Sequence, residues 1–167
     1  DRLARMVRKV SRELSKDIHF VMSGTETEVD KLIIEELSDS LMHIIRNAID
    51  HGVEEAQVRR SAGKPERGTV ALTAYQKGNH VVIEVEDDGK GIDADAIRDK
   101  ALERGLIGTE AEVSDKEAFQ LIFEPGFSTA KKVTSVSGRG VGMDVVKRAI
   151  DSLRGSIDID SKPGKGT

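Results

Sequence analysis

A two-layer α/β sandwich, in which helices cover one face of a mixed and mostly antiparallel sheet, is the fold that the sequence predicts. Helical and strand-like hydrophobic periods alternate along the chain, and residues 68–89 have the pattern of an antiparallel hairpin. The last helical pattern is followed by a short alternating run. The 167 residues suit one globular domain, because domains commonly span roughly 100 to 200 residues.

The first part of the chain predicts a helix, a strand and a longer helix. Residues 1–15 carry apolar side chains at helical spacing with basic residues between them, and residues 17–24 alternate like a strand. A long helix is expected from about Asp30 to His51, because apolar residues recur there at helical spacing and Gly52 is a suitable stop. A short helix is expected over residues 54–62.

The second part of the chain begins with the hairpin. Its two alternating runs are joined by residues 77–79, whose glycine and asparagine supply turn geometry. Ser114, followed three residues later by Glu117, has the pattern of a capping box at the start of a helix. Helical patterns lie at residues 93–104, 114–123 and 141–153, and the run 156–161 alternates as a strand.

The composition excludes several classes of protein. A net charge of −4 argues against a broad basic face for nucleic acid, which requires many neutralised phosphates. The absence of cysteine excludes disulfides and thiolate metal sites. No apolar run reaches the ~20 residues of a membrane span, and no signal peptide opens the sequence. We expect a soluble, cytoplasmic domain with no nucleic-acid partner and no membrane insertion.

A polar stripe on the long helix is the first candidate site. His43, Asn47, Asp50 and His51 fall within a narrow sector away from the apolar stripe. A solvated face is the simpler explanation, but asparagine and histidine form helices less readily than glutamate, lysine and glutamine. An asparagine oxygen suits Mg²⁺, while a histidine can serve as a base or a phosphate donor.

The second strand of the hairpin supplies the next candidate. Alternation places Asp87 on the same face as Ile83 and Val85, and Asp88 on the opposite face. Asp87 therefore continues an apolar row, where a carboxylate needs partners such as the exocyclic amine of adenine. Alternatively, the strand has ended and Asp87 begins an Asp-Asp-Gly turn. Gly89 and Gly91 favour a site slightly, since a flat ring could approach their backbone closely.

A glycine-rich loop precedes the last helix. Gly138, Gly140 and Gly142 alternate with single residues, and a helix N-terminus attracts phosphate. A dinucleotide fingerprint requires G-x-G-x-x-G directly after a strand, and this spacing differs. A Walker A loop requires Ser or Thr after Gly-Lys, and none of the Gly-Lys pairs in the chain has one. Taken alone, such a loop is more often a turn than a site.

Four motifs occur in one order along the chain: HIIRNAIDHG, VEDDGKGI, FEPGFST and SGRGVGMDVV. They resemble the N, G1, F and G2 boxes of the ATP-binding family that includes sensor histidine kinases, gyrase-type ATPases, Hsp90 and mismatch-repair ATPases. The segments RNAIDHG and GFSTAKKVTSVSGRGVGMDVV are similar in sequence to those of the chemotaxis kinases within that family. The resemblance covers essentially the whole chain and implies the Bergerat-type ATP-binding fold.

The resemblance also implies roles for individual residues. Asp87 would contact the adenine amine, Gly89 and Gly91 would line the adenine pocket, and Asn47 would coordinate Mg²⁺. His43 lies one helical turn before Asn47, where gyrase-type ATPases have a water-activating glutamate, and is a candidate catalytic base or orienting group. Residues 123–142 would form the lid over the nucleotide. Further ATP contacts are implied at Asp50, His51, Ile92, Lys100, Lys132, Ser137, Gly138, Arg139, Gly140, Val141, Gly142 and Met143.

The implied function is protein histidine kinase activity, with ATP and Mg²⁺ as cofactors, in a chemotaxis two-component phosphorelay. None of the four histidines lies in a phosphoacceptor setting, so the γ-phosphoryl group is expected to pass to a histidine on a separate domain. Implied partners are response regulators, chemoreceptors and a coupling protein, within a homodimeric, receptor-associated parent of which this domain alone is monomeric. Residues 1–15 would join it to a preceding domain. The alternatives are an ATPase clamp of the gyrase or Hsp90 type and a binding module without catalysis.

Overall fold

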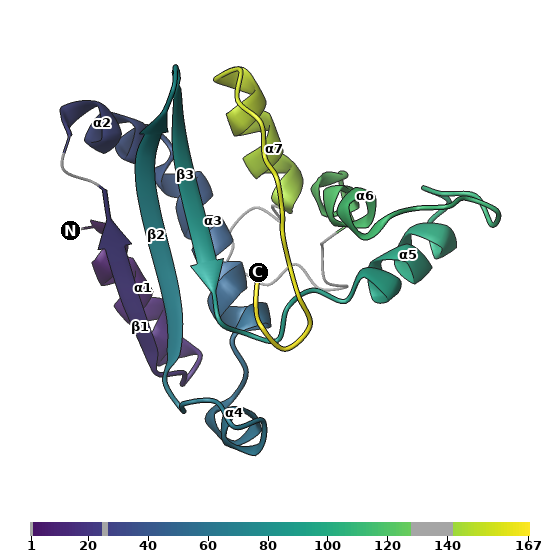
Figure 1. Ribbon diagram of the computed structural model, residues 1–167, viewed down its shortest axis with the longest axis horizontal. Coiled ribbons are helices and arrows are strands. Elements are labelled where there is room, and N and C mark those ends of the chain that lie inside the picture. Colours follow the sequence, from purple (N-terminus) through teal and green to yellow (C-terminus); the bar gives the residue numbers. More distant parts are fainter. Residues whose placement is uncertain (1, 25–26, 128–141) are drawn as a thin grey trace. The chain divides into compact units, whose positions relative to one another are not determined.

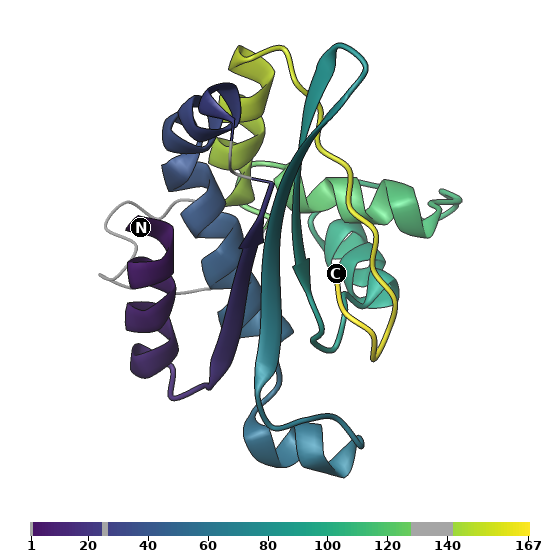
Figure 2. The same cartoon turned by 60° about the vertical axis from the view of Figure 1, so that its left-hand side comes forward.

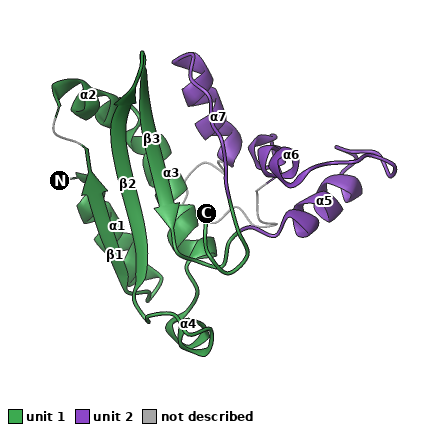
Figure 3. Cartoon of the chain, in the orientation of Figure 1, with its two compact units in different colours: residues 1–91, 161–167 green, residues 92–160 purple. Residues whose placement is uncertain are grey.

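A computed structural model describes residues 2–24, 27–127 and 142–167, which form two compact units. Unit 1 comprises residues 1–91 and 161–167, and unit 2 comprises residues 92–160 (Figure 3). The chain thus leaves unit 1 after Gly91 and returns to it at Ser161. The single domain expected from the chain length stays a prediction, because a compact unit need not be an independent domain.

The sheet of unit 1 has the strand order β1-β2-β3 (Figure 1). Strand β1 (Ile18–Ser23) pairs in parallel with β2 (Gly68–Lys77), which pairs antiparallel with β3 (His80–Asp87). The predicted α/β class, mixed sheet and hairpin are therefore confirmed. The pair of β1 and β2 is parallel because the crossover between these strands passes through helices.

Three helices lie on one face of this sheet: α1 (Arg2–Glu13), α2 (Glu28–Glu36) and α3 (Ser38–Asn47) (Figure 2). The apolar stripes of α1 and α3 pack on the inward-facing residues of the strands, as amphipathic helices do on a half-buried sheet. Buried members of this core are Val7, Val10, Ile18, Ile45, Ile49, Val53 and Val70.

The long helix expected from Asp30 to His51 is interrupted at Leu37, which separates α2 from α3. Leu37 has ψ of 6°, and the Ser-Asp-Ser run that follows forms the first turn of α3, a position that suits these residues better than a helix interior. The last turn, Ala48–Gly52 (η1), is π-helical, and the Val53 N–H donates to the carbonyl of Ala48 at 2.8 Å. The helix ends at Gly52, as predicted.

The remaining helices follow the predicted order. The short helix α4 (Ala56–Ser61) precedes β2 in unit 1. Unit 2 contains α5 (Ala94–Glu103), α6 (Asp115–Gln120), the 3-10 turn η2 (Leu121–Phe123) and α7 (Met143–Ser152). Its core comprises Ile97, Ala101, Ala118, Phe119 and Phe127. The predicted cap of α6 is confirmed, since Ser114 Oγ accepts the Glu117 N–H at 3.1 Å. None of the described helices is long and apolar enough to cross a membrane.

The strand predicted over residues 156–161 is wrong. Ile157 and Ile159 are half-buried between exposed neighbours, so the alternation in burial is present, but the segment is extended chain outside the sheet. The Gln120 amide donates to the carbonyl of Ile157 at 3.0 Å, so this backbone acceptor bonds to a side chain. Alternation reports which side chains are covered and does not by itself require a neighbouring strand.

The position of Ile45 tests the core of unit 1. Ile45 is fully buried on α3, and Ile45→Ala should lower the free energy of unfolding by about 2–5 kcal/mol, since apolar transfer and cavity costs add. Leu32→Ala on the exposed face of α2 is the control and should change it by less than about 0.5 kcal/mol. Urea denaturation measures both. Equal losses would contradict the assignment of the core.

Candidate functional site

Asp87 is a buried carboxylate at the end of β3. It pairs in the sheet with Val70, which is fully buried, and its own exposed fraction is 8%. Leu72 opposite Val85 continues the same row along the two strands. The alternation argument is therefore confirmed for this face: Asp87 lies on the row that packs against the helices, and the strand reaches it.

Two backbone groups hold the Asp87 side chain and main chain in place. The Gly89 N–H donates to Asp87 Oδ1 at 2.8 Å, and the Asp87 N–H donates to the carbonyl of Thr167 at 2.9 Å. Burial raises the pKa of the Asp87 carboxyl above its ordinary value, although the bond from Gly89 acts in the opposite direction. Negative charge on Asp88 and Glu54 raises it further. The carboxylate is thus a strong acceptor in an apolar setting.

The segment after β3 lies directly against the end of η1. A Cβ at Gly89 would overlap the carbonyl of Gly52, and a Cβ at Gly52 would lie 3.2 Å from both carboxylate oxygens of Asp87. The Lys90 N–H also donates to the Gly52 carbonyl at 2.9 Å. At Gly89 the space of the missing side chain is therefore filled by protein backbone. The predicted adenine contact of Gly89 remains a prediction.

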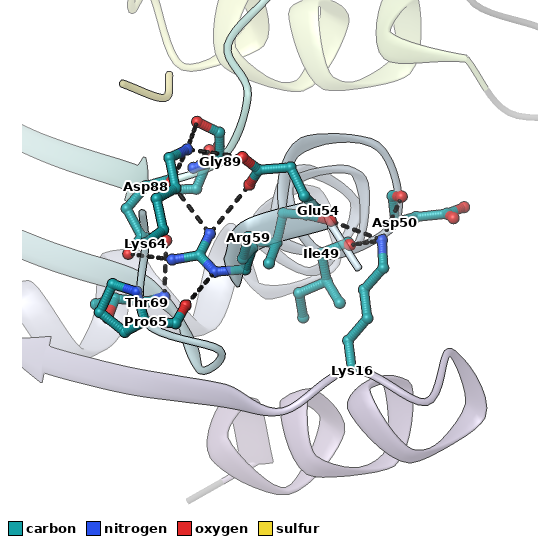
Figure 4. A network of polar contacts seen from close by, with 12 residues as sticks. Lys16, Ile49, Asp50, Glu54, Arg59, Lys64, Pro65, Thr69, Asp88 and Gly89 are labelled. Atoms are coloured by element: carbon teal, nitrogen blue, oxygen red, sulfur yellow. Dashed lines mark hydrogen bonds and ion pairs between the residues drawn. The ribbon is translucent and has the colours of Figure 1, made fainter. Parts of the chain in front are cut away.

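The neighbouring Asp88 faces away from Asp87 and serves a different purpose. Its Oδ1 accepts the Thr69 N–H at 2.9 Å, and its Oδ2 accepts Arg59 Nη2 at 2.9 Å. The Arg59 side chain is completely buried and also donates to Glu54 Oε1 at 3.0 Å (Figure 4). Burial would raise the pKa of Glu54, but the hydrogen bond and charge of Lys64, with Arg59, lower it below its ordinary value. Sequence reasoning missed this cluster because each member alone resembles a surface charge.

A lysine from the loop after α1 secures the π-helical turn. Lys16 Nζ donates to the carbonyls of Ile49, Asp50 and Val53 at 2.7–2.8 Å (Figure 4). Carbonyls at a helix C-terminus lack intrahelical partners and carry partial negative charge, so a lysine there both bonds and neutralises them. The turn leaves the side chains of Asp50 and His51 exposed, with Asp50 Oδ2 3.6 Å from His51 Nε2.

His43 and Asn47 lie one turn apart on α3 and are half-buried. Asn47 is the last residue of the regular helix, immediately before η1. Within the described parts of the chain, no group of three or more His, Cys, Asp or Glu side chains could hold a metal ion. A neutral amide oxygen therefore fits Mg²⁺ only together with ligands from a substrate, which is how Mg²⁺ commonly binds.

Gly91, the last residue of unit 1 before the chain leaves it, has a positive φ, and a Cβ there would overlap the Lys162 carbonyl. The remaining predicted contacts belong to unit 2 or lie outside the described residues. In unit 2, Lys100 Nζ lies 5.0 Å from the centre of the Phe127 ring, and burial, with the charge of Arg104, lowers the pKa of Lys100. Gly142 is the N-cap of α7, Met143 is its buried first residue and Ile92 is half-buried. Outside the described residues are Lys132, Ser137, Gly138, Arg139, Gly140 and Val141, and with them most of the predicted lid 123–142.

A comparison with protein families identifies the class of this fold and site. Residues 36–167 match the family described as Histidine kinase-, DNA gyrase B-, and HSP90-like ATPase. The match covers more than half of the chain, and the chain belongs to this family. The resemblance read from the four motifs is confirmed, and membership supports ATP as the bound nucleotide.

Within this family, the chain is similar to chemotaxis kinases among the curated relatives. The chain is 57% identical over its whole length to the sensor histidine kinase CheAY of Helicobacter pylori, and 51% identical to the chemotaxis proteins CheA of Treponema pallidum and Bacillus subtilis over 99% and 100% of its length. It covers 21%, 20% and 25% of those proteins, so it spans about a fifth to a quarter of the length of the relatives it matches.

Substitution of the two adjacent aspartates should affect the stability of the fold differently. Because the folded-state pKa of Asp87 is raised, its carboxyl favours folding when protonated, and that contribution is lost as the pH rises through the raised pKa. Asp87→Asn should therefore leave the melting temperature unchanged or raise it at about pH 7, with the difference from wild type shrinking as the pH approaches the ordinary carboxyl range. Thermal unfolding across that pH range measures this, and a marked loss of stability at neutral pH would contradict it.

Asp88→Asn is the matched variant at the neighbouring position. It replaces the oxygen that accepts Arg59 and leaves a buried guanidinium partly uncompensated. We expect a loss of about 1–3 kcal/mol in the free energy of unfolding. The same denaturation series measures it, and a stability equal to wild type would show that Asp88 does not hold this cluster together.

Proposed function

We propose that the chain is the ATP-binding catalytic domain of a chemotaxis histidine kinase, which binds Mg-ATP and transfers the γ-phosphoryl group to a histidine on a separate phosphoacceptor domain. The observation that carries this proposal is Asp87, an acceptor-only carboxylate buried at the end of β3 in a chain of this ATPase family. The similarity to CheA proteins over the whole chain supports the kinase within that family.

Adenine recognition follows from the chemistry of Asp87. An ionised carboxylate can accept about four hydrogen bonds, and the Gly89 N–H supplies one to Oδ1. The exocyclic amine of adenine would donate another, which would offset part of the cost of burying the charge. Gly91 follows this segment and is proposed, with Gly89, to line the same pocket.

The phosphate end of the nucleotide is proposed to lie along the end of α3. Asn47 would hold Mg²⁺ through its amide oxygen together with phosphate oxygens, and the ion supplies charge neutralisation when bound. Asp50 and His51, exposed on η1, are proposed nucleotide contacts. Ile92, Lys100, Lys132, the glycines of the lid and Met143 keep the roles that the resemblance implies.

The proposed reaction is a phosphoryl transfer in which positioning and charge stabilisation supply most of the catalysis. The bond between the γ-phosphorus and the bridging oxygen breaks, ADP leaves with the electron pair, and a nitrogen of the acceptor imidazole bonds to phosphorus. The acceptor loses a proton as it does so. His43 would take that proton or orient the acceptor.

The proposed partners belong to the longer protein. Relatives that are four to five times the length of their matching segment suggest further domains, among them the phosphoacceptor domain. Response regulators would take the phosphoryl group from that domain, while chemoreceptors and a coupling protein would bind elsewhere in a homodimeric, receptor-associated parent at the cytoplasmic face of the membrane.

One assay separates the proposed kinase from its alternatives. The chain is incubated with γ-labelled ATP, Mg²⁺ and a purified phosphoacceptor domain of a CheA protein, and label is followed on the acceptor and as free phosphate. Label on the acceptor histidine is the expected result. Free phosphate without acceptor labelling would instead favour an ATPase clamp, and ATP binding with neither would favour an inert binding module.

His43→Gln tests the proposed catalytic residue. Glutamine keeps hydrogen-bonding capacity but cannot accept a proton at neutral pH, so transfer should slow by roughly 10²–10⁴-fold while ATP affinity changes little. Single-turnover transfer and equilibrium ATP binding measure the two effects. His80→Gln, at the exposed start of β3, is the control and should match wild type. Unchanged transfer in His43→Gln would remove the catalytic role.

A further inference from the structure

The peptide between Asp88 and Gly89 is hydrogen-bonded through both its N–H and its carbonyl. Its N–H, contributed by Gly89, donates to Asp87 Oδ1 at 2.8 Å. Its carbonyl, contributed by Asp88, accepts Lys64 Nζ at 3.0 Å and Arg59 Nη1 at 3.2 Å. The N–H and carbonyl of a trans peptide point in opposite directions. Two cations therefore hold the side of this peptide that faces away from Asp87.

Lys64 and Arg59 are themselves fixed. Lys64 Nζ also donates to Glu54 Oε2 at 2.7 Å and to the Gly89 carbonyl at 2.8 Å, so it bonds to two consecutive peptides (Figure 4). Arg59 Nε donates to the Pro65 carbonyl at 2.7 Å, and its other nitrogens bond to Glu54 and Asp88. Buried charged donors with several satisfied bonds orient their acceptors more strictly than exposed ones do.

We propose that Lys64 and Arg59 are positioning residues for adenine: by holding the carbonyl of the Asp88–Gly89 peptide, they direct its N–H at Asp87 and fix that carboxylate where it meets the base. This inference deepens the proposed function and rests on it. Both residues would act through the peptide and without contact with the nucleotide. Their effect passes through one peptide plane, whose N–H becomes a stronger donor when its carbonyl is bonded to a cation.

The charged groups around Asp87 should make ATP affinity depend on pH. Glu54, which follows η1, and Asp88, the next residue along the chain, both act to raise the pKa of Asp87, in addition to burial. Lys64 Nζ bonds to Glu54 Oε2, so the charge of Lys64 opposes that of Glu54. The amine of adenine donates to the ionised carboxylate. ATP affinity should therefore fall as the pH drops through the pKa of Asp87, and removal of Lys64 should move that midpoint to higher pH.

Lys64→Met tests the inference, because the Lys64 side chain reaches the surface, whereas Arg59 is completely buried and its replacement would strand two carboxylates. We expect ATP affinity to fall roughly tenfold, the preference for ATP over GTP to decrease, and the binding midpoint to move to higher pH. Lys64→Arg should restore all three, and Lys64→Gln, a neutral donor, should be intermediate. Arg60→Met removes an exposed arginine that pairs with Glu66 and should behave as wild type.

Calorimetric titration with ATP and with GTP across a pH series provides these values, and thermal unfolding confirms that each variant is folded. A Lys64→Met protein with wild-type affinity and midpoint would overturn the inference, as would a loss equal to that of Arg60→Met. A loss of affinity with an unmoved midpoint and an unchanged ATP preference would also overturn it, since that is a general structural effect. Wild-type protein without ATP affinity would overturn the proposed function itself.

Discussion

The pairing of Val70 with Asp87 determines the rest of the candidate site. It places a carboxylate on the row of side chains that otherwise fills the core, at the point where β3 ends. A buried carboxylate requires hydrogen-bond donors, and the chain supplies one by turning at Gly89 so that a backbone N–H returns to it. That turn brings the segment against Gly52 and joins the end of the strand to the end of the helix. Burial of one charge thus fixes the geometry of two elements.

Lysine side chains stabilise the ends of both elements by the same physical means. Lys16 donates to three carbonyls at the end of the helix, and Lys64 donates to two carbonyls after the end of the strand. Backbone groups at these ends have lost their regular partners, so an ammonium group satisfies several acceptors at once and offsets their partial charge. An end fixed in this way can leave its remaining side chains available for binding, as Asp50 and His51 are.

The position of Asp87 could be predicted from the sequence, because alternation along a strand assigns each side chain to one face of the sheet without knowledge of the neighbouring strands. The α/β class, the hairpin and the helix cap at Ser114 could also be predicted, because they depend on local sequence patterns. The π-helical turn and the burial of Arg59 could not be predicted, because both depend on partners distant in the sequence, such as Lys16 for the turn. The strand predicted over residues 156–161 is absent for a related reason. Alternation of apolar and polar residues is a local property, whereas strand pairing requires a partner elsewhere in the chain.

The return of the chain at Ser161 has a consequence for how this protein can vary. Gly164 donates to the carbonyl of Lys90, and a Cβ at Gly91 would touch Ser161 and the Lys162 carbonyl, so the points where the chain leaves and re-enters unit 1 adjoin. Unit 2 is therefore topologically an insertion between neighbouring ends. Loop-closure entropy rises only slowly with length, so such an insertion can lengthen, shorten or be exchanged at modest cost. Evolution or design could alter residues 92–160 while the bonds around Asp87 stay intact.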